Sequence, residues 1–295
     1  MSEDSLTAER EQRRHEREAR RRRREGKGGR RTKIGVAAAL VGVFVAAAAV
    51  AALAYRHFHH SSPPPAPPPR TVTVTIPEGY SRPQTAALAR EEGLRGSYMA
   101  ASKGHEGFLF PDTFELERHA KAADLVGLQL EDFKRRIAGV SLAYARSKNL
   151  TLHDVVTIAS MVEHEAVSEG DRRKVAEVIY NRLREGMPLG IDATIRFAND
   201  NYTRPLTESE LAIDSPYNTR THAGLPPGPI DSPGLASLQA AAHPARGDYL
   251  FYVVQPGACN KLAFSSSEAE FEEDSARYNE AREAAGGNSP TTCGE

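Results

Sequence analysis

An uncharged run of 22 residues, Ile34 to Tyr55, limits more than any other feature what this chain can fold into. A helix of this length without charges can cross a bilayer. Residues 1–33, which precede it, hold 13 Lys and Arg against 7 Asp and Glu, and include the run Arg20 to Arg24. Because basic flanks stay on the cytoplasmic side, we expect a single-pass protein of the cell membrane. Its N-terminus would be cytoplasmic and its body extracytoplasmic.

A cleaved signal peptide is the alternative for the apolar run, because Ala52-Leu53-Ala54 resembles a small-residue cleavage site. The basic region and the apolar run are both too long for a typical signal peptide, which favours an uncleaved anchor. We predict that residues 1–33 form a disordered basic arm, 34–55 a transmembrane helix and 56–70 a linker. The run PPPAPPP makes that linker extended.

The rest of the chain is acidic, with 25 Lys and Arg against 32 Asp and Glu beyond residue 33. An acidic body repels phosphates, so we exclude nucleic acid as the main ligand. The alternation of TVTVTI at 71–76 predicts a strand. Residues 120–150 have the apolar spacing of a helix, and DYLFYVVQ at 248–255 indicates a buried strand. We therefore expect an α+β fold.

Residues 151–187 predict two amphipathic helices joined by a polar turn, with a capping box from Thr151 to Asp154 at the start of the first. Ile158, Val162 and Glu165 follow the i, i+4, i+7 spacing of one helix face. Glu165 thus places a carboxyl on an apolar stripe, where burial raises its pKa. Such a glutamate can act as a general acid near neutral pH. The alternative is a helix end where the stripe meets solvent.

Several other chemistries are excluded by the absence of their motifs. The sequence has no G-x-S-x-G elbow, P-loop or dinucleotide fingerprint. Glu163, His164 and Glu165 face different ways on a helix and cannot converge on one ion, so we expect no metal and no other cofactor. A glycan hydrolase normally needs a second carboxylate. Glu163, Asp192 and Asp112 are the candidates.

Six segments, in this order, carry a resemblance to a known family. They are EGFLFPDTFEL (106–116), ASMVEHEA (159–166), VAEVIYNRLREGMPLGIDAT (175–194), SPYNT (215–219), GLPPGPIDSPG (224–234) and YLFYVV (249–254). The series resembles the endolytic murein transglycosylases, the MltG/YceG-like family. The resemblance implies lytic cleavage of the bond between N-acetylmuramic acid and N-acetylglucosamine in peptidoglycan, leaving 1,6-anhydromuramic ends and terminating strand growth. It also implies peptidoglycan synthases as partners.

The resemblance implies Glu165 as the catalytic residue, alternately acid and base. The residues expected to bind substrate are Glu163, Asn181, Asp192, Thr194, Tyr217, Asn218 and Thr219. Asn181 could equally cap a contact between helices, and Asp192 with Thr194 could serve a turn. Glu163 could orient substrate or be solvated. Two other functions remain open: a non-catalytic scaffold that binds the cell wall, and a true muramidase-type hydrolase with Asp192 or Glu163 as base.

The chain departs from the family pattern in three places. His164 stands where the family usually has lysine, at a position expected to face away from the apolar stripe. Residues 71–104 correspond to only the last part of a LysM-like β-α module, before an expected catalytic domain at 105–285 and a tail at 286–295. The loop after the YLFYVV strand lacks the histidine that relatives often carry. On the outer side of a membrane, Cys259 and Cys293 could form a disulfide, with two unpaired thiols as the alternative.

Overall fold

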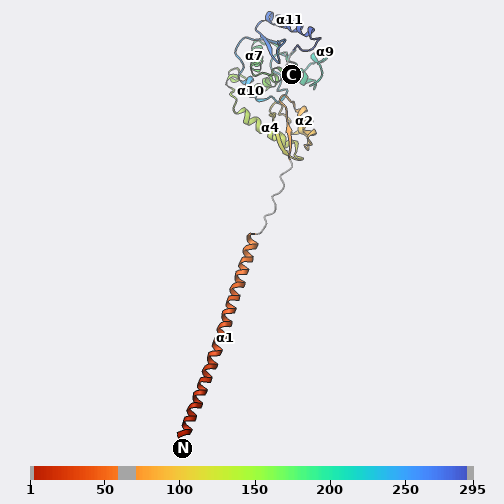
Figure 1. The fold of residues 1–295 in the computed structure, drawn as a ribbon. Coiled ribbons are helices and arrows are strands. Elements are labelled where there is room, and N and C mark those ends of the chain that lie inside the picture. Colours follow the sequence, from red (N-terminus) through yellow and green to blue (C-terminus); the bar gives the residue numbers. More distant parts are fainter. Residues whose placement is uncertain (1–2, 59–70, 291–295) are drawn as a thin grey trace. The chain divides into compact units, whose positions relative to one another are not determined.

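The computed structural model describes residues 3–58 and 71–290, and the chain divides into two compact units, residues 1–68 and 69–295. The first unit contains one long helix, α1 (Glu3–Phe58) (Figure 1). Its segment Ala38–Phe58 is the one stretch within the described ranges that is long and apolar enough to cross a membrane. The basic arm is part of this helix, which differs from the disorder expected for it. Arg and Glu make up 17 of the 33 residues of the arm, and both favour helix even where no apolar face exists to be buried.

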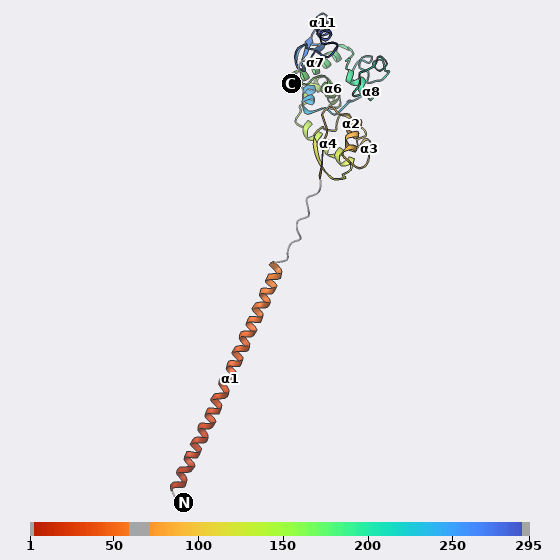
Figure 2. The ribbon, with the colours of Figure 1, turned by 45° about the vertical axis from the view of Figure 1, so that its right-hand side comes forward.

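The second unit begins with a small sheet and the helices that cover it. Strand β1 (Thr71–Thr75) pairs antiparallel with β2 (Thr113–Glu117), with Val74 opposite Phe114. Helices α2 (Arg82–Glu91) and α3 (Tyr98–Ala101) lie between these strands in sequence, and α4 (Ala122–Ile137) follows them (Figure 2). Their apolar side chains form a cluster of buried residues that extends from Val74 to Val126, across the expected boundary between residues 104 and 105.

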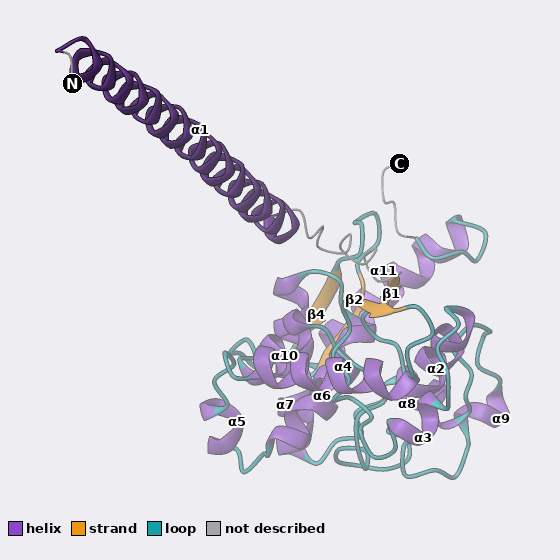
Figure 3. Cartoon of the chain, turned by 90° about the horizontal axis from the view of Figure 1, so that it is seen from below, coloured by secondary structure: helices purple, strands orange, loops and turns teal. Residues whose placement is uncertain are grey.

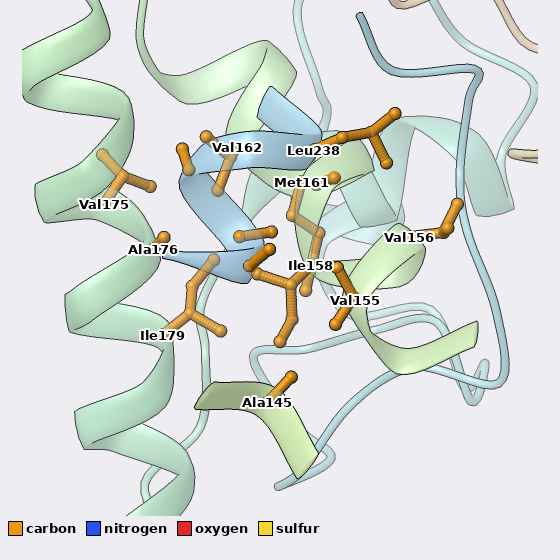
Figure 4. Packing of buried hydrophobic residues seen from close by; sticks show 14 of the residues in the cluster. Ala145, Val155, Val156, Ile158, Met161, Val162, Val175, Ala176, Ile179 and Leu238 are labelled. Atoms are coloured by element: carbon orange, nitrogen blue, oxygen red, sulfur yellow. The ribbon is translucent and has the colours of Figure 1, made fainter. Parts of the chain in front are cut away.

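The main core surrounds α6 (Leu152–Glu165), which packs against α7 (Glu169–Glu185) and α10 (Leu235–Ala242). Residues 155–162 are buried on every face of α6. Figure 4 shows Ile158 of this helix facing Ile179 of α7, and Met161 beside Leu238 of α10. The short α5 (Ala143–Ser147) packs against α10. The helix that carries Glu165 is therefore the centre of the fold.

Local signals in the sequence define the start of α6 and both ends of α7. The Asp154 carboxylate accepts a hydrogen bond from the Thr151 amide at 2.8 Å, and the Thr151 hydroxyl accepts one from the Asp154 amide at 3.2 Å. The predicted capping box is confirmed. Helix α7 starts after Ser168 and ends at Gly186, whose φ of 69° places it in the left-handed region that glycine favours.

Two predicted elements are wrong. The helix expected over residues 120–150 is broken after Ile137, at Ala138-Gly139, and resumes only as α5. The strand expected to be buried, β3 (Phe251–Val254), is half-buried. Among the described residues it pairs only with β4 (Leu262–Ser265), and the pair is covered by α11 (Glu268–Ala284), a charged helix without buried residues.

The stretch from residue 188 to 234 contains two short helices, α8 (Asp192–Ala198) and α9 (Glu208–Leu211). Figure 3 shows that helices and loops make up most of the second unit and that its strands are few and short. This mixed composition confirms the predicted α+β class.

Candidate active site

A cavity of about 270 Å³ lies in the second unit, where α6, α8 and the first turn of α2 meet. Its apolar lining comes from Ala193, Phe197 and Ile230. Its polar lining comes from Gln84, His164, Glu165, Asp192, Arg196 and Tyr202. A larger hollow of about 660 Å³ lies beside β2 and α4. Glu165 does not border it, and charges of both signs are mixed along its wall, so we place the chemistry in the smaller cavity.

Glu165 is the last residue of α6 and is only partly exposed. Burial raises the pKa of its carboxyl, and the nearby Asp192 carboxylate raises it further. The Tyr252 hydroxyl donates a hydrogen bond to Glu165 Oε2 at 2.9 Å. This bond stabilises the ionised carboxylate and so acts to lower the pKa of Glu165. The C-terminal end of a helix also disfavours a negative charge. These conditions keep a carboxyl protonated at a higher pH than in water, as a general acid requires.

His164 and Asp231 form a pair beside Glu165. His164 Nε2 lies 2.7 Å from Asp231 Oδ2, and the Asp231 side chain is 1% exposed. Burial raises the pKa of Asp231 to about 6, although His164 acts to lower it. Burial acts to lower the pKa of His164, but the carboxylates of Asp231, Glu165 and Glu163 together outweigh it, so that this pKa is raised. His164 was expected to face away from the stripe, yet it borders the same cavity as Glu165.

Glu163 points to another side and does not border the cavity. Its side chain is 7% exposed and lies 3.3 Å from the Arg172 guanidinium of α7. Its Oε2 accepts a hydrogen bond from the Gly234 amide at 2.9 Å, at the start of α10. Glu163 therefore joins α6 to α7 and α10. It was expected to be solvated or to orient substrate.

Asp192 does line the cavity, at the first residue of α8. Arg220 holds its carboxylate through Nε at 2.9 Å and Nη2 at 2.7 Å. Thr194, two residues further along α8, is buried. Its hydroxyl lies 3.0 Å from that of Thr219, and both hydroxyls form hydrogen bonds with the backbone of Ile191. Thr194 and Thr219 thus fix α8 from behind and do not reach the cavity.

The remaining residues expected to bind substrate also make contacts within the protein. Asn181 donates to the carbonyls of Gly247 and Tyr249 at 3.2 and 2.9 Å, which joins α7 to the segment before β3. Asn218 is buried and donates to two backbone carbonyls of its own loop. Tyr217 packs its ring 4.9 Å from that of Phe197, which borders the cavity, so it supports the wall from behind.

Sequence reasoning missed five residues that contribute to the site: Gln84, Arg196, Tyr202, Asp231 and Tyr252. Asp231 and Tyr252 lie inside the segments GLPPGPIDSPG and YLFYVV, which carry the family resemblance. The resemblance marked these segments but did not indicate which of their side chains contribute to the site. Gln84 lies in the first turn of α2 and borders the cavity. Its Oε1 accepts a hydrogen bond from the Ser81 amide at 3.0 Å. Nothing in the sequence places α2 beside α8.

No group of three or more His, Cys, Asp or Glu side chains that could hold a metal ion is found within residues 3–58 and 71–290. Cys293 lies outside the described residues, so its pairing with Cys259 stays a prediction.

Comparisons with known proteins by sequence and by structure both find YceG-like proteins. The model of the YceG-like family matches residues 47–277. An endolytic murein transglycosylase of Bacillus subtilis is 34% identical over 179 residues, which is 60% of this chain and 47% of that protein. One of Streptococcus pneumoniae is 31% identical over 223 residues, 61% of this chain and 40% of that protein. The chain thus spans less than half the length of these curated relatives.

A crystal structure of a YceG-like protein from Listeria monocytogenes has a related fold. It superposes with a TM-score of 0.57 at 28% sequence identity, covering 68% of this chain and 74% of that one.

Proposed function

The chain belongs to the YceG-like family, and on that premise we propose that it is an endolytic murein transglycosylase. It would cleave the β-1,4 bond between N-acetylmuramic acid and N-acetylglucosamine in nascent peptidoglycan, leaving a 1,6-anhydromuramic end and terminating strand growth. One observation carries the proposal. The carboxyl of Glu165 borders a cavity at the centre of the fold, and burial raises its pKa.

Glu165 performs both proton transfers in this reaction. Its carboxyl protonates the glycosidic oxygen as the bond to the muramic anomeric carbon breaks. The resulting carboxylate then takes the proton of the muramic C6 hydroxyl, whose oxygen bonds the same anomeric carbon. The two transfers return Glu165 to its protonated form, and no water is consumed. The Tyr252 hydroxyl, 2.9 Å from Oε2, stabilises the ionised form between the two steps.

A hydrolase of the same bond is the second candidate, because Asp192 borders the same cavity as Glu165. In that reaction the Asp192 carboxylate would activate a water molecule, and a reducing end would form. The contact with Arg220 argues against this role, since two guanidinium donors already occupy Oδ1 of the Asp192 carboxylate.

We also propose that α1 anchors the protein as a single-pass helix in the cell membrane. The Arg-rich arm would lie in the cytoplasm and the second unit outside it, where peptidoglycan and the synthases that make it are found. Residues 71–104 would be the remnant of a LysM-like module. The order β1, α2, α3, β2 supports this assignment and extends the module through residue 117.

Incubation of the detergent-solubilised full chain with peptidoglycan tests the reaction. Mass spectrometry of the products distinguishes anhydro ends from reducing ends, which are one water heavier. We expect anhydro ends, lost in Glu165→Gln and retained in Glu169→Gln, a matched change at an exposed glutamate of α7. Reducing ends would support the hydrolase, and no cleavage would support a scaffold that binds the cell wall. Full activity in Glu165→Gln would refute the mechanism.

A further inference from the structure

Arg196, in the last turn of α8, borders the same cavity as Glu165. Its Nη1 donates to the carbonyl of Arg204 at 2.8 Å and lies 3.5 Å from that of Asn201. Within residues 3–58 and 71–290, its Nε and Nη2 have no hydrogen-bond partner and no carboxylate lies within ion-pair distance. The guanidinium is therefore held in place at one nitrogen while its other donors remain available.

The other charged groups around the cavity are already neutralised. Arg220 pairs with Asp192, and His164 with Asp231. When Glu165 is protonated, as its role as acid requires, Arg196 leaves the cavity with an unbalanced positive charge. A neutral sugar would not balance that charge, whereas a carboxylate would.

From this arrangement we infer that Arg196 binds a carboxylate carried by the muramic acid side of the substrate, and so selects glycan strands that bear one. The inference rests on the proposed function. Muramic acid carries a lactyl group next to the bond that is cut. In intact strands the lactyl carboxyl is joined to a stem peptide, which has carboxylates of its own; in strands stripped of peptide it is free. A guanidinium fork suits either group, because it offers two parallel donors to the two carboxylate oxygens.

Three substrates test this inference on the full chain in detergent: strands with stem peptides, strands stripped of peptide, and stripped strands whose lactyl carboxyl has been converted to a neutral methylamide. We expect Arg196→Gln to lower kcat/KM on a carboxylate-bearing strand about 10-fold more than on the neutral strand. Arg196→Lys, which keeps the charge, should lose less. A loss on peptide-bearing strands alone identifies the stem-peptide carboxylates, and a loss on stripped strands identifies the lactyl group.

Arg146→Gln is the matched control, because it removes the charge of an exposed arginine of α5 that does not border the cavity. Any loss it causes should be equal on all three substrates. An equal loss on all three for Arg196→Gln, or no loss on any, would overturn the inference.

Binding of the same strands to Glu165→Gln, with and without Arg196→Gln, repeats the test without turnover. If the wild-type chain releases no ends but Arg196→Gln weakens binding of the charged strands selectively, the inference stands and the proposed reaction falls. If cleavage occurs and neither rate nor binding depends on the carboxylate, the inference alone falls.

Discussion

Gly107 makes the contact between two segments that are far apart in sequence, and replacing it with alanine measures how closely they pack. Its φ is 81°, and an added Cβ would lie 2.4 Å from Pro229 Cβ and 2.9 Å from Val156 Cγ1. The left-handed backbone costs a non-glycine residue about 1–2 kcal/mol, and the overpacking about 1–3 kcal/mol more. We expect Gly107→Ala to lower the free energy of unfolding by about 2–5 kcal/mol.

Two other glycines separate these contributions. Gly104 has a φ of 79° with no atom within 4 Å of an added Cβ, so Gly104→Ala should lose only the backbone term, about 1–2 kcal/mol. Gly127 lies in α4 with nothing within 4 Å, so Gly127→Ala should gain about 1 kcal/mol of helix propensity.

Urea unfolding of the full chain in detergent, followed by near-ultraviolet circular dichroism of its 10 tyrosines, compares the three variants. Because Pro229 precedes Ile230 and Asp231, Gly107→Ala should also slow cleavage by shifting the cavity wall. If Gly107→Ala were no less stable than Gly104→Ala, the close contact with Pro229 would be refuted.

Three further outcomes follow from the site. Tyr252→Phe should raise the pKa of Glu165 further, because a donor to its ionised form is lost; the alkaline limb of kcat/KM would move to higher pH, and an unmoved limb would contradict the hydrogen bond. Asp231→Asn should lower the pKa of His164 in an NMR titration, since burial is then opposed only by the weaker effects of Glu165 and Glu163; an unchanged pKa would exclude the pairing. Thr151→Ala should lower the free energy of unfolding by about 1 kcal/mol in urea, and no change would mean the capping box contributes nothing.

The sequence predicted well those elements whose signals are local. The Thr151 capping box and the apolar phase of α6 each depend on residues within a few positions of one another. The same phase placed Glu165 on the stripe of Ile158 and Val162, both of which are buried. Local hydrogen bonding and helical periodicity are sufficient for such features, because no distant contact changes them.

The elements that the sequence did not predict depend on distant partners. Helix α8 has 7 residues, too few to form alone. It exists because Thr194 bonds Thr219, 25 residues away. Amide and hydroxyl side chains suit sugar binding and backbone bonding equally, so their types did not reveal that Asn218 and Thr219 turn inward. The half-buried state of β3 was likewise invisible, since it depends on how many strands join its sheet.

Glu165 is the last residue of α6, and the last turn of a helix usually frays. Here the turn is held by side chains that bond one loop: Ser160 accepts from the Ile230 amide at 3.1 Å, Glu163 accepts from the Gly234 amide, and His164 pairs with Asp231. Fraying of the last turn would require the contacts of both Glu163 and His164 to open, while Ser160 fixes the preceding turn to the same loop. The thermal motion of the Glu165 carboxyl should therefore match that of the buried core, and the proton donor is in place before substrate arrives.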